Sequence, residues 1–257
     1  EIIRWLIDSI KLRKSDIIII IYHPVLTDFK FKEFINSYYS NIKLIELKNE
    51  TLGACDTISK SFAYLSKKKD EKLLILDGDN FFQDDIIGKS HKSKKDKIFY
   101  FQSLSKDPIY SYIQLKGKRV INIEEKVKIS NFASVGAYFF NSTKKAIENI
   151  NDVLKKTSVI KEYYLSVAYK ELLLKNQIIE AEEIKEFTCF GTPDLINKFK
   201  SFEKKRVCFD LDNTLTTFPK KIGDYKTCKP IHKNIEFLQN LKKNGHYIII
   251  YTARRMK

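Results

Sequence analysis

The chain has 257 residues, of which 43% are hydrophobic and 31% are charged, with 8 Gly, 5 Pro and 4 Cys. This composition excludes a disordered chain, a disulfide-rich scaffold and a fibrous protein, and the length allows one large domain or two unequal ones. The formal net charge is +15, yet only six of the 47 basic residues are Arg. Because Arg is the usual reader of phosphates and bases, we expect a lysine-rich surface and no nucleic-acid partner.

Membrane and metal signals are weak in this sequence. No apolar run approaches the ~20 residues that a membrane-spanning helix needs, so no membrane span is expected. The four cysteines form no CxxC pair and the four histidines are scattered, which argues against a zinc site and favours reduced thiols in the cytoplasm. The chain opens at Glu1 and stops at Lys257, just beyond a strong motif, so both ends are expected to be truncated.

The amino-terminal part alternates helices and strands. Apolar residues at helical spacing predict a helix over 1–12, and the isoleucine run 17–21 predicts a strand that is covered on both faces. This alternation predicts a Rossmann-like α/β fold with a mixed, mostly parallel sheet and flanking helices. The further elements expected here are a helix over 31–39, a strand over 42–47, a helix capped by Thr51 over 52–65 and a strand over 72–76.

The middle of the chain predicts a hairpin, and a second α/β unit follows a charged linker at 201–206. We therefore predict two domains, 1–202 and 203–257. The expected elements of the first are strands 111–115 and 119–123, strand 132–140, helices 143–155 and 160–174, strand 178–181 and a helix ending near 199. Those of the second are strand 207–211, helix 231–244 with Gly245 as its C-cap, and strand 247–251.

The segment Asp77-Gly78-Asp79-Asn80 follows the strand predicted at 72–76. Open α/β sheets bind ligands at this end of their strands, and two carboxylates there can hold a Mg²⁺ that is shared with a phosphate. Asp, Gly and Asn also suit an ordinary polar turn. The motif alone leaves both interpretations open.

Further motifs before and after this segment favour the metal-binding interpretation. In their order and spacing they resemble the sugar-phosphate nucleotidyltransferases over roughly residues 1–200. The resemblance implies a fold like that of the GT-A enzymes and a Mg²⁺-dependent transfer of a nucleotidyl group from an NTP to a sugar 1-phosphate, with release of pyrophosphate. The segments that carry it are Thr51–Ala54, Asp77–Asn80, Ile123–Lys126, Ile129–Phe140, Glu162–Tyr164 and Phe190–Pro193.

The resemblance also assigns roles at the expected reaction centre. Asp79 is the aspartate that binds Mg²⁺ at the α-phosphate, and Asp77 lies beside it as a second metal ligand. Glu125 and Lys126 form a pair whose lysine contacts the sugar phosphate. In-line attack on phosphorus is catalysed mainly by positioning and charge neutralisation, which a metal ion and a lysine supply.

Three residues are expected to bind the substrates. By the same resemblance, the backbone of Gly53 approaches the base, Gly136 lies against the sugar and Glu162 reaches its hydroxyls.

The sequence departs from the family pattern in two places. The glycine-rich loop that holds the triphosphate is absent before the first helix, and Cys189 stands where the family often has a further metal-binding aspartate. Cys is a poor Mg²⁺ ligand, so Cys189 weakens the expectation of catalysis without affecting that of the fold.

The second unit contains a more specific sequence motif than the first. The run Val207–Thr216 resembles the first motif of the haloacid-dehalogenase-like phosphatases, and Ile248–Arg254 resembles their second. The later lysine and acidic metal-binding pair of that family do not follow in this sequence. We therefore expect an incomplete phosphatase unit of low activity.

This second resemblance implies a covalent phosphatase mechanism. Asp210 is then the nucleophile, Asp212 the general acid and base, and Thr252 a hydrogen-bond donor to the phosphoryl group. Thr214 is expected to bind substrate, and Asp210 and Asp212 to hold Mg²⁺.

Together the two units predict a cytoplasmic, bifunctional enzyme that makes activated sugars for a capsule or surface polysaccharide. One alternative is a nucleotide-sugar-dependent glycosyltransferase, against which the segments Glu125-Lys126 and Gly191-Thr192-Pro193 speak. The other is a regulatory homologue that binds nucleotide or sugar without turnover, which Cys189 and the absent loop favour. The sequence leaves open the base, the sugar and a non-sugar acceptor such as phosphocholine.

Overall fold

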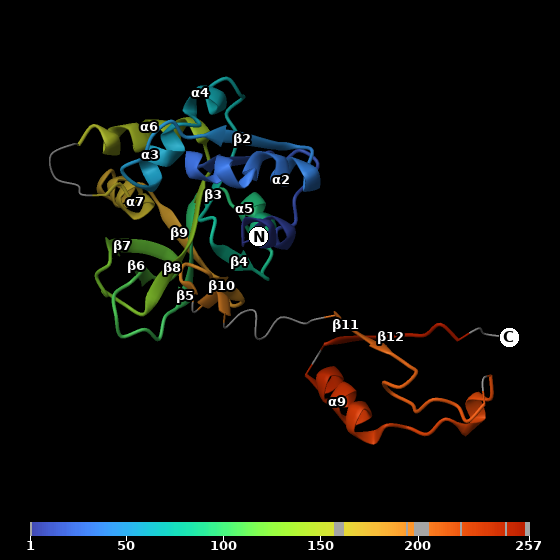
Figure 1. The fold of residues 1–257 in the computed structure, drawn as a ribbon. Helices are drawn as coiled ribbons and strands as arrows, with labels where there is room; N and C mark the ends of the chain where they lie inside the picture. The colour runs from blue at the N-terminus through green and yellow to red at the C-terminus, as the bar shows by residue number, and fades with distance from the viewer. Residues whose placement is uncertain are drawn as a thin grey trace. The chain divides into compact units, whose positions relative to one another are not determined.

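The computed structural model describes residues 2–156, 162–193, 195–197, 206–221, 223–244 and 246–254 (Figure 1). The chain divides into two compact units, Glu1–Thr192 and Pro193–Lys257. The predicted domain boundary at 202, the helix end near 199 and Gly245 lie outside the described residues. Within the described ranges, no helix is long and apolar enough to cross a membrane.

The amino-terminal elements confirm the predicted alternation of helices and strands. The strands β1 and β2 pair in parallel, from Ile18 opposite Ile42 to Tyr22 opposite Glu46. His23 caps the short 3-10 helix η1, since its Nδ1 accepts a hydrogen bond from the Val25 amide at 3.2 Å. The elements are α1 (Ile2–Ser9), β1 (Ile18–Tyr22), η1 (Pro24–Phe29), α2 (Phe31–Tyr38), β2 (Ile42–Glu46) and β3 (Leu73–Leu76).

The single helix predicted over 52–65 is wrong, because the segment forms two short helices, α3 (Ala54–Ser59) and α4 (Phe62–Leu65). Helix α3 starts after Gly53, whose φ of 122° is not helical. The carbonyl of Leu52 instead accepts a hydrogen bond from the Tyr163 amide at 2.8 Å. Thr51 therefore does not cap the helix, and its hydroxyl lies 2.6 Å from that of Thr57.

The principal sheet is mixed but mainly antiparallel, which corrects the predicted mostly parallel sheet. In the described part of the chain, its strand order is β3-β8-β5-β9-β7-β6, and β5–β9 is the parallel pair. The long strand β8 inserts between β3 and β5 and runs antiparallel to both, an arrangement that local hydrophobic patterns do not encode. The strands are β5 (Asp96–Gln102), β6 (Ser111–Lys116), β7 (Arg119–Glu125), β8 (Phe132–Phe140) and β9 (Ile179–Glu183).

Three elements near the end of β3 were not predicted. The strands β4 (Asn80–Phe82) and β10 (Phe187–Cys189) pair antiparallel, with Cys189 opposite Asn80 (Figure 1). Helix α5 (Ile86–Lys92) is the third, and the Asp85 carboxylate caps it by accepting a hydrogen bond from the Gly88 amide at 2.9 Å.

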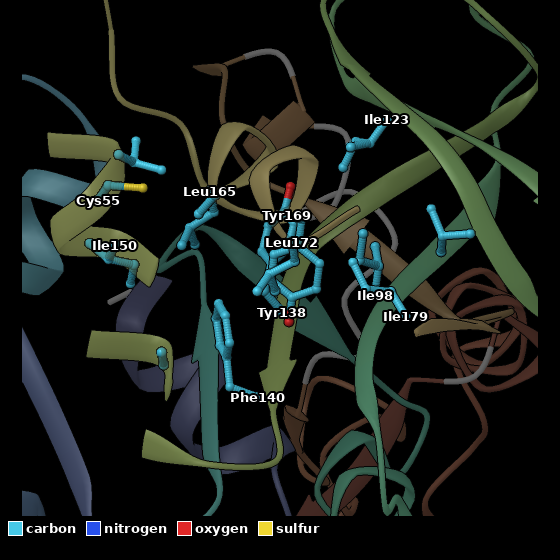
Figure 2. Close-up of a cluster of buried hydrophobic side chains, with 14 of the residues drawn as sticks. Cys55, Ile98, Ile123, Tyr138, Phe140, Ile150, Leu165, Tyr169, Leu172 and Ile179 are labelled. Carbon is cyan, nitrogen blue, oxygen red and sulfur yellow. The ribbon is translucent and has the colours of Figure 1, made fainter. Parts of the chain in front are cut away.

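The core of the first unit packs the helices α6 (Thr143–Leu154) and α7 (Leu165–Leu174) against the sheet. Figure 2 shows Tyr169 and Leu172 of α7 beside Tyr138 of β8. The Tyr169 hydroxyl donates a hydrogen bond to the Phe139 carbonyl at 2.7 Å, and its ring centroid lies 4.9 Å from that of Phe140. This buried contact anchors the start of α7, which contributes side chains to the candidate site.

The second unit pairs β11 (Arg206–Asp210) and β12 (Tyr247–Tyr251) in parallel, as predicted. Its helices are the 3-10 helix η2 (Tyr225–Thr227) and α9 (His232–Lys243). Phe209 and Leu215 are buried in this unit, whereas most of β12 is exposed.

Candidate active site

The Asp77 carboxylate is held against a glycine of the neighbouring strand. The Asp77 amide donates a hydrogen bond to the Gly136 carbonyl at 2.9 Å, next to the pair formed by Leu76 and Ala137. Gly136 has a φ of 67°, and a Cβ there would lie 2.1 Å from Asp77 Oδ2 and 2.7 Å from Asn80 Nδ2. A side chain at Gly136 would therefore displace the carboxylate.

Asp77 belongs to a cluster of negative charge. The surrounding protein desolvates its carboxylate and, with the charges of Asp79 and Glu125, raises the pKa of Asp77 to about 7. Asp77 is nevertheless exposed to water, which weakens the effect of desolvation. Repulsion from Asp79 and Glu125 raises the pKa of Asp77 in the same direction. A divalent cation would relieve this repulsion.

The donor set suits a cation that is shared with a substrate. No group of three His, Cys, Asp or Glu among the described residues is arranged to hold a metal ion without help. Mg²⁺ is usually bound by one or two carboxylates, with phosphates and water completing the shell. Beside Asp77, the buried Asn80 Oδ1 has no hydrogen-bond partner in the described part of the chain. The residues at the end of β3 therefore fit a Mg²⁺–phosphate complex better than a closed metal site.

Cys189 lies beside Asp79. The Phe190 amide donates a hydrogen bond to the Asp79 carbonyl at 2.7 Å. A Cβ at Gly191 would lie 3.1 Å from Asp79 Oδ2 and 3.4 Å from Cys189 Sγ. Burial raises the pKa of the Cys189 thiol, and the charges of Asp79 and Asp77 raise it further. The thiol is therefore protonated at neutral pH and cannot replace a carboxylate as a Mg²⁺ ligand.

Lys126 lies at the end of β7 with a φ of 53°. Its Nζ donates a hydrogen bond to the Tyr164 hydroxyl at 2.6 Å and lies 4.8 Å from the centre of that ring. The Tyr164 hydroxyl in turn donates to the Glu162 carboxylate. The hydrogen bond to Tyr164 raises the pKa of Lys126, so an exposed and permanently charged ammonium faces the solvent here.

Two serines fix the neighbouring Glu125. The Ser111 hydroxyl of β6 and the Ser166 hydroxyl of α7 both donate to Glu125 Oε2, the second at 2.7 Å. Glu125 therefore has its orientation set from two elements while its charge acts on Asp77.

Gly53 packs against the backbone of the segment that carries Glu162. A Cβ at Gly53 would lie 2.7 Å from the Tyr163 nitrogen and 3.1 Å from Glu162 Cγ. The Cys55 amide donates to the Tyr163 carbonyl at 2.8 Å, which holds the two segments together. The Glu162–Tyr164–Lys126 hydrogen bonds continue this chain of contacts to Lys126, while Glu125 acts on Asp77 through its charge.

In the second unit, parallel pairing brings two candidates to adjacent strand ends. Asp210 lies opposite Tyr251, and Thr252 follows directly. The Leu211 amide donates to the Tyr251 carbonyl at 3.1 Å, which extends the pairing. The backbone carbonyl of Thr214 accepts a hydrogen bond from Asn234 Nδ2 at 2.7 Å, so α9 holds the loop after β11.

Asp212 is engaged by a residue whose role the sequence did not reveal. Arg254 Nε donates to both Asp212 oxygens, at 3.0 and 3.1 Å, and Arg254 Nη2 donates to Thr216 Oγ1 at 3.1 Å. The hydrogen bonds from Arg254 lower the pKa of Asp212. The carboxylate is therefore ionised and paired, whereas a general acid must carry a proton.

Sequence reasoning missed the residues that orient the candidates: Ser111, Ser166, Tyr164 and Arg254. Tyr164 and Arg254 stand inside segments that carry the two resemblances, which was a usable signal. Ser111 and Ser166 contact Glu125 from distant parts of the chain and gave none.

Known proteins provide an independent comparison. The sequence profile of the family described as Nucleotidyl transferase matches residues 3–179, well over half of the chain. No curated protein sequence matches.

Among solved structures, the nucleoside-diphosphate-sugar pyrophosphorylase from Vibrio cholerae RC9 is 23% identical with a TM-score of 0.63, over 72% of this chain and 80% of that one. The inositol-1-phosphate CTP transferase from T. maritima is 17% identical with a TM-score of 0.54, over 71% and 76%. The chain therefore belongs to the nucleotidyl transferase family.

Proposed function

We propose that the first unit transfers a nucleotidyl group from an NTP to a sugar 1-phosphate, with Mg²⁺ as cofactor. The observation that carries this proposal is the cluster of negative charge that Asp79 and Glu125 form around Asp77, with the Lys126 ammonium directly after Glu125 and hydrogen-bonded to Tyr164. It supplies two carboxylates for a metal ion and one exposed ammonium for a phosphate.

The reaction needs positioning more than acid–base chemistry. An oxygen of the acceptor phosphate, already ionised at neutral pH, attacks the α-phosphorus, and the bond to the β-phosphate oxygen breaks to release pyrophosphate. Lys126 binds the acceptor phosphate and offsets its repulsion from the triphosphate, while Glu125 keeps the end of β7 oriented through Ser111 and Ser166. Bound to Asp77 and Asp79, Mg²⁺ supplies charge neutralisation at the α-phosphate.

The remaining candidates bind the two substrates. Gly53 has no side chain to cover the backbone of its segment, so it suits a close approach by the base. Glu162 is exposed and accepts hydrogen bonds, so it suits sugar hydroxyls. Gly136 leaves room for Asp77 and for the sugar above the strand. The acceptor stays open between a sugar 1-phosphate and a related phosphate, since one solved structure with this fold is described as a transferase for inositol 1-phosphate.

For the second unit we propose a haloacid-dehalogenase-like phosphatase segment over 203–257, beside a nucleotidyltransferase domain over 1–202. Asp210 is the nucleophile and Thr252 the phosphoryl-binding residue, supported by their adjacent strand ends. Asp212 is the acid and base, with Thr214 at the substrate and Mg²⁺ at Asp210 and Asp212. Because Arg254 holds Asp212 ionised, this unit is a weak phosphatase as it stands.

The setting we propose is cytoplasmic synthesis of a nucleotide-sugar for a capsule or surface polysaccharide.

One observation favours a second candidate function, a homologue that binds nucleotide or sugar without turnover. Cys189 lies beside Asp79, at a position where a carboxylate could have been a further metal ligand. Incubation of the protein with each NTP and candidate acceptor phosphates, with assay of products and binding, distinguishes these functions. Pyrophosphate supports nucleotidyl transfer, a nucleoside diphosphate released from a nucleotide-sugar supports a glycosyltransferase, and binding without product supports the non-catalytic homologue.

A further inference from the structure

The segment Glu162–Tyr164 is fixed to the rest of the first unit through its backbone. The Tyr163 amide donates a hydrogen bond to the Leu52 carbonyl at 2.8 Å, and the Tyr163 carbonyl accepts one from the Cys55 amide at 2.8 Å. The Tyr164 carbonyl accepts a further hydrogen bond from the buried Cys55 thiol at 3.2 Å. The Tyr164 side chain therefore extends from a backbone position that α3 holds in place.

Lys126 has a fixed backbone and a long, exposed side chain. Its amide donates a hydrogen bond to the Tyr110 carbonyl at 3.0 Å, and its φ of 53° is left-handed. The ammonium, however, ends a flexible four-carbon stem, and ordering such a stem at a surface costs conformational entropy. A lysine that binds a phosphate from this position therefore gains from a neighbour that holds its ammonium.

Tyr164 makes two different contacts with the Lys126 ammonium. Its hydroxyl accepts one of the three ammonium N–H groups, at 2.6 Å, which leaves two for a phosphate. The centre of its ring lies 4.8 Å from Lys126 Nζ, within the range in which an aromatic face attracts a cation. The two contacts together define both the distance and the direction of the ammonium.

The same hydroxyl connects Lys126 to Glu162. It donates to the Glu162 carboxylate while it accepts from Lys126, so one oxygen lies between a cation and an anion. The hydrogen bond to Glu162 raises the pKa of Tyr164, which keeps the hydroxyl protonated and able to donate. Two hydrogen bonds that share one oxygen keep the ammonium and the carboxylate within roughly 6 Å of each other. The two groups that the proposed function assigns to the acceptor are therefore held near each other before any acceptor binds.

We propose that Tyr164 is a positioning residue, which holds the Lys126 ammonium ready for the acceptor phosphate and links it to Glu162 at the acceptor hydroxyls. The role in the reaction rests on the proposed function, whereas the hold on Lys126 does not. Tyr164 acts through Lys126 and touches no reacting atom. Because it orders the ammonium before the acceptor arrives, its loss weakens acceptor binding without slowing the chemical step.

The hold on Lys126 is tested without substrate. The wild type is compared with Tyr164→Phe, which keeps the ring, and with Tyr164→Leu, which removes the ring as well. Each protein is labelled with a trace of acetic anhydride, and acetylation of every lysine is followed by mass spectrometry. The hydrogen bond to Tyr164 raises the pKa of Lys126, so its loss increases the fraction of reactive neutral amine. We expect Lys126 to react about threefold faster in Tyr164→Phe and faster still in Tyr164→Leu, with the exposed Lys144 unchanged.

The role in the reaction is tested by steady-state kinetics with the acceptor phosphate that supports pyrophosphate formation. In Tyr164→Phe the KM for the acceptor is expected to rise by about 3- to 10-fold, while kcat and the KM for the NTP stay nearly unchanged. Tyr164→Leu should show a larger rise, because the attraction between ring and cation is lost as well. In a Lys126→Met background, Tyr164→Phe should change the KM by less than about twofold, because it acts through the ammonium. Tyr38→Phe, at an exposed tyrosine of α2, is the control and should match the wild type.

Labelling of Lys126 at the wild-type rate in both variants overturns the proposal. An equal rise in the acceptor KM with and without the Lys126 ammonium also overturns it, because Tyr164 would then act independently of Lys126. Tyr164→Phe keeps the ring and the backbone contacts of Tyr164, so it is expected to keep the wild-type Tm. Absence of pyrophosphate from the wild type contradicts the proposed function, and the labelling then decides on its own whether Tyr164 holds Lys126.

Discussion

The Asp77 carboxylate occupies the space that a side chain at Gly136 would need, with Asp77 Oδ2 2.1 Å from the position of a Cβ. Gly136→Ala is therefore expected to lower the rate of pyrophosphate formation by about 100-fold, since it displaces one of the two proposed metal ligands. The left-handed backbone at Gly136, with a φ of 67°, adds a loss of about 1 kcal/mol in the free energy of unfolding.

Gly117→Ala is the matched control. Gly117 has a φ of 61°, but nothing lies within 4 Å of its Cβ position. Gly117→Ala should show the loss of stability due to the left-handed backbone alone, Gly136→Ala should lose at least as much in urea unfolding, and only Gly136→Ala should lose activity. If the two variants retain the same pyrophosphate rate, the Asp77 carboxylate does not have the role proposed here.

The Lys126 ammonium is expected to act on the acceptor phosphate. Lys126→Met removes a charge-assisted hydrogen bond, so the KM for the acceptor should rise by roughly 10- to 100-fold while the KM for the NTP changes little. Steady-state kinetics with each substrate varied in turn provide the measurement. Lys144→Met, at an exposed position on α6, is the control. An equal rise in the KM values for the acceptor and the NTP would contradict a specific contact between Lys126 and the acceptor phosphate.

Much of the first unit could be predicted because its apolar runs are local and strong. The runs that form β1, β7 and β8 are bounded by polar residues, and the structure confirms them. The short strands β4 and β10 could not be predicted, since each has three residues and depends on a partner about a hundred positions away. The antiparallel insertion of β8 beside β3 is likewise a tertiary choice that no local pattern records.

The candidate site shows the same division. Asp77 and Asp79 could be predicted from the sequence because they lie in a polar segment directly after an apolar strand. The partners of Lys126 and Asp212 could not, because Tyr164 and Arg254 reach them only after folding. Cys189 is intermediate: the resemblance placed it where the family often has a metal-binding aspartate, and the pairing of β4 with β10 sets it opposite Asn80, the residue after Asp79.

Cys55 should resist thiol reagents in the folded protein. The side chain is fully buried, and burial raises the pKa of its thiol to about 12. At pH 8 only about one molecule in ten thousand carries the reactive thiolate, whereas Cys208 is exposed. Iodoacetamide labelling followed by mass spectrometry should modify Cys208 before Cys55, and urea should abolish the difference. Labelling of Cys55 at the rate of Cys208 in the native protein would contradict the packing of α3 against α7.

The second unit should hydrolyse phosphate esters poorly. Arg254 keeps Asp212 ionised, so the leaving oxygen has no proton donor there. Mg²⁺-dependent release of phosphate from p-nitrophenyl phosphate is expected to stay within about twofold of that of Asp210→Asn. A wild-type rate far above that of the variant would show a working phosphatase.

The central claim is that Asp79 takes part in nucleotidyl transfer, and pyrophosphate formation tests it most directly. The wild-type chain, Asp79→Ala and the control Glu148→Ala, at an exposed position on α6, are incubated with each NTP, Mg²⁺ and candidate acceptor phosphates. We expect pyrophosphate from the wild type and from Glu148→Ala with one combination of substrates, and a loss of about 100-fold or more in Asp79→Ala. Equal pyrophosphate release by Asp79→Ala and the wild type, or none from any combination, would contradict the account.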